Sequence, residues 1–268
     1  MSALTAAAIQ TAPIFGDVSG NVARALARVP ADCRLAVLPE LCTTGYQFAS
    51  RDEAIALAEP VPAGPACQAF RDFAARRDTT LVAGLAELAR DADGRERVFN
   101  SAALFRPDGT WAVYRKVHLF LDEKDLFAPG DRGFPVFPAC GTTVGLMICF
   151  DWLFPEAART LALAGATLLC HPANLVLPHC PEAMITRCLE NRVFAVTANR
   201  VGVEHRAREE LRFIGLSQIV SPRGERLACC DGVAEGAAVA LIDPDATDKQ
   251  ITPRNDVLAD RRPQAYRL

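Results

Sequence analysis

Short apolar runs alternate with amphipathic stretches along this chain, which is the pattern of an α/β protein. Three apolar runs in the first half predict strands: Leu4–Ala12, Arg34–Glu40 and Thr80–Leu88. Two amphipathic stretches between them predict helices: Gly20–Val29 and Gln68–Arg77. A strong hairpin signal follows at Arg106–Thr110, where the sequence RPDGT separates two further apolar runs.

The same order of elements recurs from Thr142 onward. The second half has predicted strands at 143–149, 166–174 and 194–201, predicted helices at 155–166 and 183–192, and a second hairpin at 221–225. The two halves share this order and almost no sequence identity, so we expect two pseudo-symmetric β-α-β-α-β-hairpin halves. This repeated order predicts two central sheets with helices on their outer faces, which is a four-layer α-β-β-α sandwich. A single doubly wound sheet is the alternative fold.

The end of the chain carries one more predicted strand, Ala237–Asp245, and a polar tail. We expect residues 1–268 to form one domain, and the tail at about 246–268 to pack on a partner subunit or to fray. The charged run Glu204–Arg212 is expected to be a solvated face, with an oligomer contact as the alternative.

Composition limits the classes of protein and of partner. Half of the 268 residues are hydrophobic and 23% are charged, which is typical of a globular chain. The net charge of −3 gives no reason to expect nucleic acid or an anionic membrane as partner. No apolar run approaches the roughly 20 residues that span a bilayer. The first residues also lack the pattern of a signal peptide, so we expect a cytoplasmic protein.

Cysteine is abundant, with ten residues, yet their spacing contains no CxxC pair and no Cys/His cluster typical of zinc sites. We therefore expect free thiols in a reducing compartment, nine of them small hydrophobic core residues. Cys149 is the exception, because it lies between an apolar run, Val144–Ile148, and a helix that begins near Pro155. The positive end of a helix lowers a thiol pKa, so this junction predicts a nucleophile.

Two other predicted strands end in residues that suit such a nucleophile, Glu40 and Lys116. Functional groups collect beyond the carboxyl ends of strands in α/β sheets, so these residues and Cys149 could face one pocket. Burial raises the pKa of a carboxyl group and suits it to accept a thiol proton. A lysine can stabilise the thiolate and the developing oxyanion, with the Phe150 amide as second donor. Glu123 could position substrate or relay a proton.

Other interpretations of these residues remain open on spacing alone. A single cysteine is more often a core residue, and a carboxylate or lysine more often a solvated charge. A histidine could replace the carboxylate as base, and the chain has four: His118, His171, His179 and His205. We expect His171 to be structural.

Five stretches together resemble the carbon–nitrogen hydrolase (nitrilase) superfamily: VLPELCTTGY, YRKVHLFLDEKDLFAPGD, GLMICFDWLFPE, HPANL and ENRVFAVTANRVG. The similarity runs from about Ile9 to the segment NDVLADRR, and thus covers nearly the whole chain. It implies an α-β-β-α sandwich that forms homodimers or larger assemblies. It also implies Glu40 as general base, Lys116 as transition-state stabiliser, Cys149 as nucleophile and Glu123 as a supporting carboxylate, with no metal or organic cofactor.

The resemblance favours hydrolysis of a small amide to an acid and ammonia through a Cys149 thioester. A nitrile is the alternative substrate, because the string CFDW after the strand occurs in amidases and also resembles archaeal-type aliphatic nitrilases. Leu153 stands where an N-carbamoyl hydrolase of the superfamily would carry arginine, which disfavours that activity. A non-catalytic scaffold would be expected to have lost the glutamate, lysine or cysteine.

Three further residues are pocket candidates: Tyr46, Trp152 and Asn174. Asn174 could bind a substrate carbonyl, or it could cap the next turn instead. Trp152 is expected to form a wall of the pocket rather than to recognise a specific group.

Overall fold

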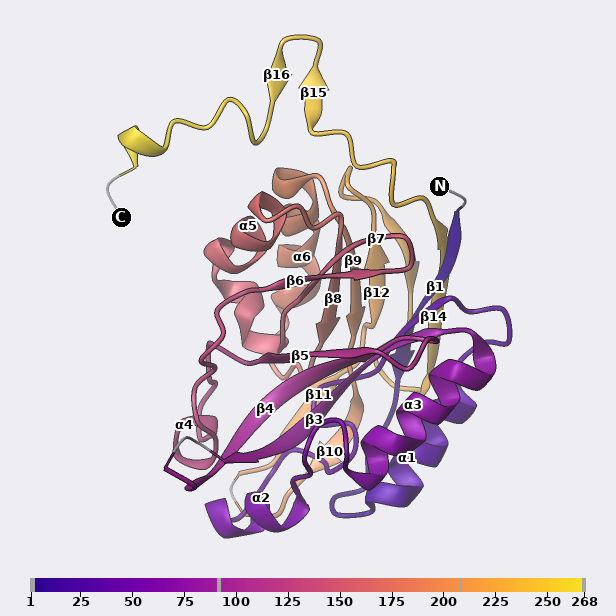
Figure 1. The fold of residues 1–268 in the computed structure, drawn as a ribbon, viewed down its shortest axis with the longest axis vertical. Helices are drawn as coiled ribbons and strands as arrows, with labels where there is room; N and C mark the ends of the chain where they lie inside the picture. The colour runs from indigo at the N-terminus through magenta and orange to yellow at the C-terminus, as the bar shows by residue number, and fades with distance from the viewer. Residues whose placement is uncertain (1–2, 91–92, 208, 267–268) are drawn as a thin grey trace.

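Two six-stranded sheets pack face to face and carry helices on their outer faces (Figure 1). The computed structural model describes residues 3–90, 93–207 and 209–266. In spatial order, the first sheet consists of β14 (Gly236–Ile242), β1 (Leu4–Gln10), β2 (Leu35–Val37), β3 (Thr80–Arg90), β4 (Glu96–Phe105) and β5 (Trp111–Arg115). The second consists of β13 (Arg226–Cys229), β12 (Gln218–Val220), β9 (Phe194–Ala198), β8 (Leu168–Pro172), β7 (Thr142–Leu146) and β6 (Val136–Ala139).

The two sheets repeat one topology. In the first, β1, β2 and β3 are parallel neighbours, and β4 and β5 follow as antiparallel strands. In the second, β7, β8 and β9 are parallel, and β12 and β13 are antiparallel. An extra antiparallel strand borders each set, β14 beside β1 and β6 beside β7. This arrangement confirms the predicted sandwich of two related halves and excludes the single doubly wound sheet.

Helices cover both outer faces of the sandwich (Figure 1). The first sheet carries α1 (Val18–Ala27) and α3 (Pro65–Arg77), and the second carries α5 (Pro155–Leu163) and α6 (Cys180–Asn191). The pleat of β1 shows how the layers are joined. Ala6 and Ala8 pack toward the second sheet, whereas Ala7 and Ile9 pack toward the helices. Both faces of the central strands are therefore buried, which is why they read as continuous apolar runs.

The remaining elements connect the sandwich and form its edges. They are α2 (Arg51–Leu57), α4 (Glu123–Leu126), the 3₁₀ helices η1 (Cys149–Leu153) and η2 (Pro263–Ala265), and the strands β10 (Val201–Glu204), β11 (Leu211–Ile214), β15 (Gln250–Thr252) and β16 (Asn255–Asp256). The predicted strand Arg34–Glu40 shortens to β2, because Pro39 has no N–H to donate and the chain turns there. No helix among the described residues is long and apolar enough to cross a membrane.

The charged run at 204–212 departs from its predicted role. It lies on the β10–β11 hairpin, and Arg208 falls outside the described residues. Glu204 is 6% exposed rather than solvated. Its carboxylate pairs with Arg200 and accepts hydrogen bonds from the backbone amides of Tyr46 and Gln47. The prediction of a solvated face is therefore wrong for Glu204, which fastens the hairpin to the loop after Glu40.

The cysteines are less uniformly buried than the sequence predicts. All ten cysteines are free, and seven are buried, Cys149 included. Cys229 is exposed, while Cys140 and Cys230 are partly buried, so the prediction of nine core cysteines was too high.

The described part of the C-terminal tail projects from the sandwich, at the end of the molecule where α5 and α6 lie (Figure 1). Lys249 ties its start to α6 by donating to the carbonyl oxygens of Asn191 and Arg192.

Candidate functional site

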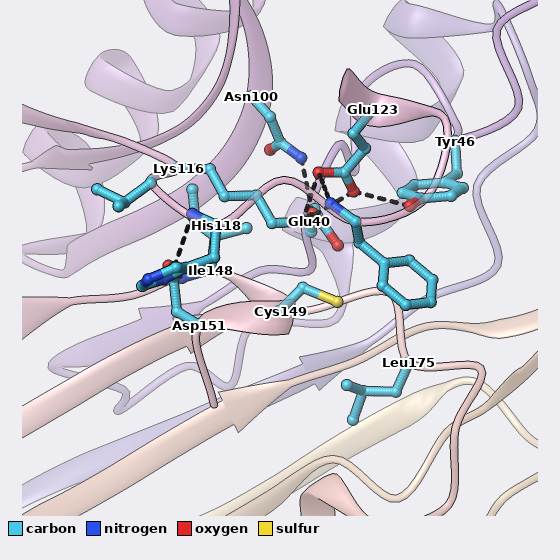
Figure 2. Close-up of polar contacts among 12 residues, drawn as sticks. Glu40, Tyr46, Asn100, Lys116, His118, Glu123, Ile148, Cys149, Asp151 and Leu175 are labelled. Carbon is cyan, nitrogen blue, oxygen red and sulfur yellow. Dashed lines mark hydrogen bonds and ion pairs between the residues drawn. The ribbon is translucent and has the colours of Figure 1, made fainter. Parts of the chain in front are cut away.

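The predicted site residues come from separate turns that follow β2, β5 and β7. Glu40 lies in the turn after β2, Lys116 follows β5 directly, and Cys149 opens η1 after β7. Their side chains meet in one cluster (Figure 2). The structure thus brings together the three residues that sequence reasoning placed at strand ends.

Lys116 is the centre of this cluster. Its Nζ lies 2.7 Å from Glu40 Oε1 and 2.8 Å from the carboxylate of Glu123. The side chain of Lys116 is completely buried. Tyr46 donates its hydroxyl proton to Glu123 over 2.7 Å, and the Phe120 amide donates to the other oxygen over 3.2 Å. One ammonium group is therefore shared by two buried carboxylates.

Burial and charge act against each other in this cluster. Burial favours the neutral form of Lys116, but the facing carboxylates of Glu123 and Glu40 outweigh it and raise its pKa above the ordinary value. Burial raises the pKa of Glu123 to about 7, and the neighbouring Glu40 charge adds to this effect while Lys116 opposes it. Burial also raises the pKa of Tyr46, so its hydroxyl stays a donor.

The raised pKa of Glu123 has a consequence for stability. A carboxyl group whose folded-state pKa lies above 4.5 stabilises the fold most at low pH, and this contribution is lost as the pH rises from 4.5 to about 7. We expect Glu123→Gln to remove this loss, on the order of 1–3 kcal/mol, from the wild-type profile. Urea unfolding at several pH values between 4 and 8 measures it. The exposed Glu156→Gln serves as control, and parallel profiles for all three proteins would contradict the assignment.

Cys149 is 5% exposed and has a φ of 40°, which non-glycine residues seldom adopt. Burial raises the pKa of its thiol well above the ordinary value, and the charge of Glu40 adds to this, whereas Lys116 and the Asn174 amide act to lower it. The prediction of a lowered pKa is therefore wrong. The α-helix begins only at Pro155, with η1 between, and the burial and carboxylates outweigh any helix effect. The thiol needs a base.

Asp151 holds the backbone around Cys149. Its Oδ2 accepts from the Ile148 amide at 2.8 Å and from the Tyr114 hydroxyl at 2.7 Å. Its Oδ1 lies 2.8 Å from Nδ1 of His118 (Figure 2). These bonds hold the backbone before and after Cys149 in its unusual conformation. Sequence reasoning missed this role, although an acidic residue two positions after the nucleophile was a visible signal.

The four histidines, the alternative candidates for the base, lie in different surroundings. Nε2 of His171 lies 3.0 Å from the carbonyl oxygen of Cys149 and must donate, because a carbonyl only accepts. Burial lowers the pKa of His171, so it stays neutral, in agreement with its predicted structural role. His118 binds Asp151, His179 precedes α6, and His205 is exposed. Among the described residues, none of the four histidines is hydrogen-bonded to the Glu40–Lys116–Glu123 cluster.

Glycines let the backbone bring these side chains together. A Cβ on Gly84 of β3 would lie 2.4 Å from the Cα of Glu40. A Cβ on Gly130 would lie 2.1 Å from the carbonyl oxygen of Arg115, next to Lys116. Only glycine allows either close approach. Both positions were missed in the sequence, where nothing local marks such a contact.

A small cavity opens beside Cys149, lined by Phe120, Phe150, Trp152, Asn174 and residues 175–177. Both polar side-chain atoms of Asn174 are buried without a hydrogen-bond partner, so its predicted alternative role as a turn cap is wrong. The backbone amide of Phe150 has no acceptor among the described residues. Trp152 is 6% exposed and lines this cavity.

Tyr46 and Glu123 line a second cavity of about 240 Å³, together with Phe48, Leu121, Leu126 and Leu211 among others. Apolar side chains dominate this cavity, while Glu123 gives it a polar contact with the Lys116 cluster. The described residues contain no group of three or more His, Cys, Asp or Glu side chains that could hold a metal ion.

Comparison with known proteins places this geometry in a family. The model of the carbon-nitrogen hydrolase family matches residues 5–251. A nitrilase from Pyrococcus abyssi is 47% identical over 87% of this chain and 86% of its own length. A carbon-nitrogen hydrolase structure from Helicobacter pylori G27 superimposes with a TM-score of 0.85 and 27% identity, over 99% of this chain and 97% of that one.

A mutant amidase from Nesterenkonia sp. AN1, with acrylamide added to its active-site cysteine, has a TM-score of 0.76 and 28% identity, with 97% of both chains covered. Sequence similarity and fold agree over nearly the full chain. The chain belongs to the carbon-nitrogen hydrolase family.

Proposed function

We propose that this protein hydrolyses the C–N bond of a small amide through a thioester on Cys149. The observation that carries the proposal is Lys116, whose buried ammonium bridges Glu40 and Glu123 beside the thiol. A buried lysine held by two carboxylates is costly for stability, and such perturbed groups cluster at catalytic sites.

The first half of the reaction forms the thioester. Glu40 takes the thiol proton as the Cys149 sulfur attacks the carbonyl carbon, and the C=O electrons move onto oxygen. Lys116 and the Phe150 amide donate to this oxyanion. When the carbonyl re-forms, the C–N bond breaks, and Glu40 returns its proton to the departing nitrogen. Ammonia leaves, and the acyl group stays on sulfur.

The second half reverses these roles with water as nucleophile. Glu40 removes a proton from water, the resulting hydroxide adds to the thioester carbon, and the same donors hold the oxyanion. The C–S bond then breaks, and Glu40 returns the proton to sulfur. A carboxylic acid is released and the free thiol is restored. The high thiol pKa makes the base necessary in the first half.

A small nitrile is a second candidate substrate, because the relative that is 47% identical is a nitrilase. Attack on a nitrile carbon gives a thioimidate after the nitrogen gains a proton, and water then releases ammonia from it. For either substrate, we propose that Asn174, which lines the cavity beside Cys149, binds the group attached to the reacting carbon, and that Tyr46 contributes through its hydrogen bond to Glu123. The unpaired amide of Asn174 supports this role, since a buried amide without a partner costs stability unless a ligand completes it.

A panel of short aliphatic amides, nitriles and ω-amides of dicarboxylates tests the function, with ammonia release as the readout. We expect Cys149→Ala to lower turnover by at least about 10³-fold, because the covalent intermediate cannot form. Mass spectrometry of rapidly quenched wild-type enzyme should show an acyl adduct on Cys149. Wild-type turnover by Cys149→Ala would rule out the mechanism. No turnover of any compound by wild type, together with a thiol inert to iodoacetamide, would favour a scaffold.

We also propose that two copies associate through the outer face of α5 and α6. Leu163 on α5 and Leu189 on α6 are 46% and 48% exposed, and Ile251 of the tail is 55% exposed. Large exposed apolar side chains on two neighbouring helices favour a protein contact. Light scattering after size exclusion should give the mass of a dimer or larger assembly, and Leu189→Glu should weaken it. A wild-type monomer at micromolar concentration would contradict this.

A further inference from the structure

Asn100 of β4 contacts both the base and the lysine of the proposed mechanism. It is completely buried. Its carbonyl oxygen accepts from the Lys116 amide over 2.8 Å, and its side-chain Nδ2 donates to Glu40 Oε1 over 2.7 Å (Figure 2). Only the N–H end of the amide can face a carboxylate, so the chemistry fixes its orientation. One residue therefore links the backbone of Lys116 to the side chain of Glu40.

The two oxygens of Glu40 have different surroundings. Oε1 accepts from both Asn100 and Lys116, while Oε2 is buried and has no hydrogen-bond partner. Oε1 therefore anchors the side chain, and Oε2 is the oxygen left to take a proton. This division suits a general base, which needs one free oxygen held in a fixed direction.

Lys116 alone is a poor anchor for this purpose. Its ammonium is a point charge on a flexible stem, and it is shared with Glu123, so it does not define which carboxylate oxygen it meets. Asn100 supplies a second donor from the middle of a paired strand, opposite Ala86 of β3. Two donors on one oxygen restrict rotation of the carboxylate.

We propose that Asn100 is a positioning residue, which orients Glu40 so that Oε2 faces the thiol proton and, later, the attacking water. The proposal rests on the function proposed above, and it assigns to Asn100 no contact with substrate. Its loss should therefore reduce the rate of the chemical steps more than the binding of substrate.

Asn100→Leu tests this, because leucine keeps the volume and removes the donor. We expect kcat to fall by about 10–100-fold with KM within about twofold of wild type, because a misdirected base slows proton transfer. The matched control is Asn191→Leu in α6, another completely buried asparagine, whose side-chain amide donates to Arg187 and Glu190 of its own helix.

Two results would overturn the proposal: a wild-type kcat in Asn100→Leu, or the same fall in kcat at unchanged KM in Asn191→Leu. If Asn100→Leu does not fold, Asn100→Ala replaces it, because alanine removes the donor and adds neither bulk nor charge beside Glu40. The pH profile of Cys149 alkylation by iodoacetamide gives a readout without substrate. It should shift in the Asn100 variant even if wild type hydrolyses no compound of the panel, a result that would contradict only the proposed function.

Discussion

Lys116→Met is expected to abolish measurable hydrolysis and to destabilise the fold. Methionine keeps the length and the apolar stem but leaves the buried carboxylates of Glu40 and Glu123 without their shared cation. Removing one partner of a buried pair costs about 3–5 kcal/mol. Loss of an oxyanion donor alone lowers kcat by about 10²–10³-fold, and the disordered base adds to that. Steady-state ammonia release and urea unfolding measure the two effects.

The pH dependence distinguishes this cause of instability from a packing defect. Without the lysine, the two carboxylates are stable together only when a proton is bound, so the stability deficit of Lys116→Met should grow as the pH rises from 5 to 8. Lys124→Met, on the exposed face of α4, is the control and should match wild type. A deficit independent of pH would show that lost packing dominates. Wild-type turnover by Lys116→Met would contradict its proposed role.

The architecture could be predicted because the central strands are buried on both sides. Ala6 and Ala8 face the other sheet while Ala7 and Ile9 face helices, so β1 appears as an unbroken apolar run, and the same holds in the second half. The edges were less predictable. Strand β6 pairs with β7 alone at the edge of its sheet, and β10 and β11 form a separate two-stranded sheet. Glu204 is buried because Arg200 and the distant backbone amides of Tyr46 and Gln47 bind its carboxylate.

In the candidate site, too, some residues could be predicted from the sequence and others could not. The end of a strand marked each of Glu40, Lys116 and Cys149, and the packing of the two sheets brings the end of β7 beside the ends of β2 and β5. Asn100 gave no such signal, since it lies within a strand and reaches Glu40 across 60 positions of sequence. The predicted direction of the pKa shift of Cys149 was wrong for a related reason. The local helix was visible in the sequence, whereas the burial that mainly raises this pKa, and the carboxylate charges that add to it, depend on distant segments.

Gly84→Ala is the second change with a large expected effect, although it removes no functional group. The turn that carries Glu40 is hydrogen-bonded to β3 at this glycine: the Gly84 amide donates to the Pro39 carbonyl over 3.1 Å, and the Cys42 amide donates to the Gly84 carbonyl over 2.9 Å. An alanine Cβ would lie 2.4 Å from the Glu40 Cα and 2.6 Å from the Pro39 oxygen. These are backbone atoms, so no side-chain rotation relieves the clash.

The backbone of Glu40 must therefore move away from β3 in Gly84→Ala, and the carboxylate moves with it. A displacement of about 1 Å at a reacting group costs about 10²-fold in rate, and overpacking costs about 1–3 kcal/mol of stability. We expect kcat/KM to fall by at least that factor while the protein still folds. Gly236→Ala on β14 of the same sheet is the control, because its nearest neighbour would be the Cys230 sulfur at 4.0 Å. If Gly84→Ala loses stability but keeps wild-type kcat/KM, the rate does not depend on a fixed Glu40, and the base assigned to this turn must be sought elsewhere.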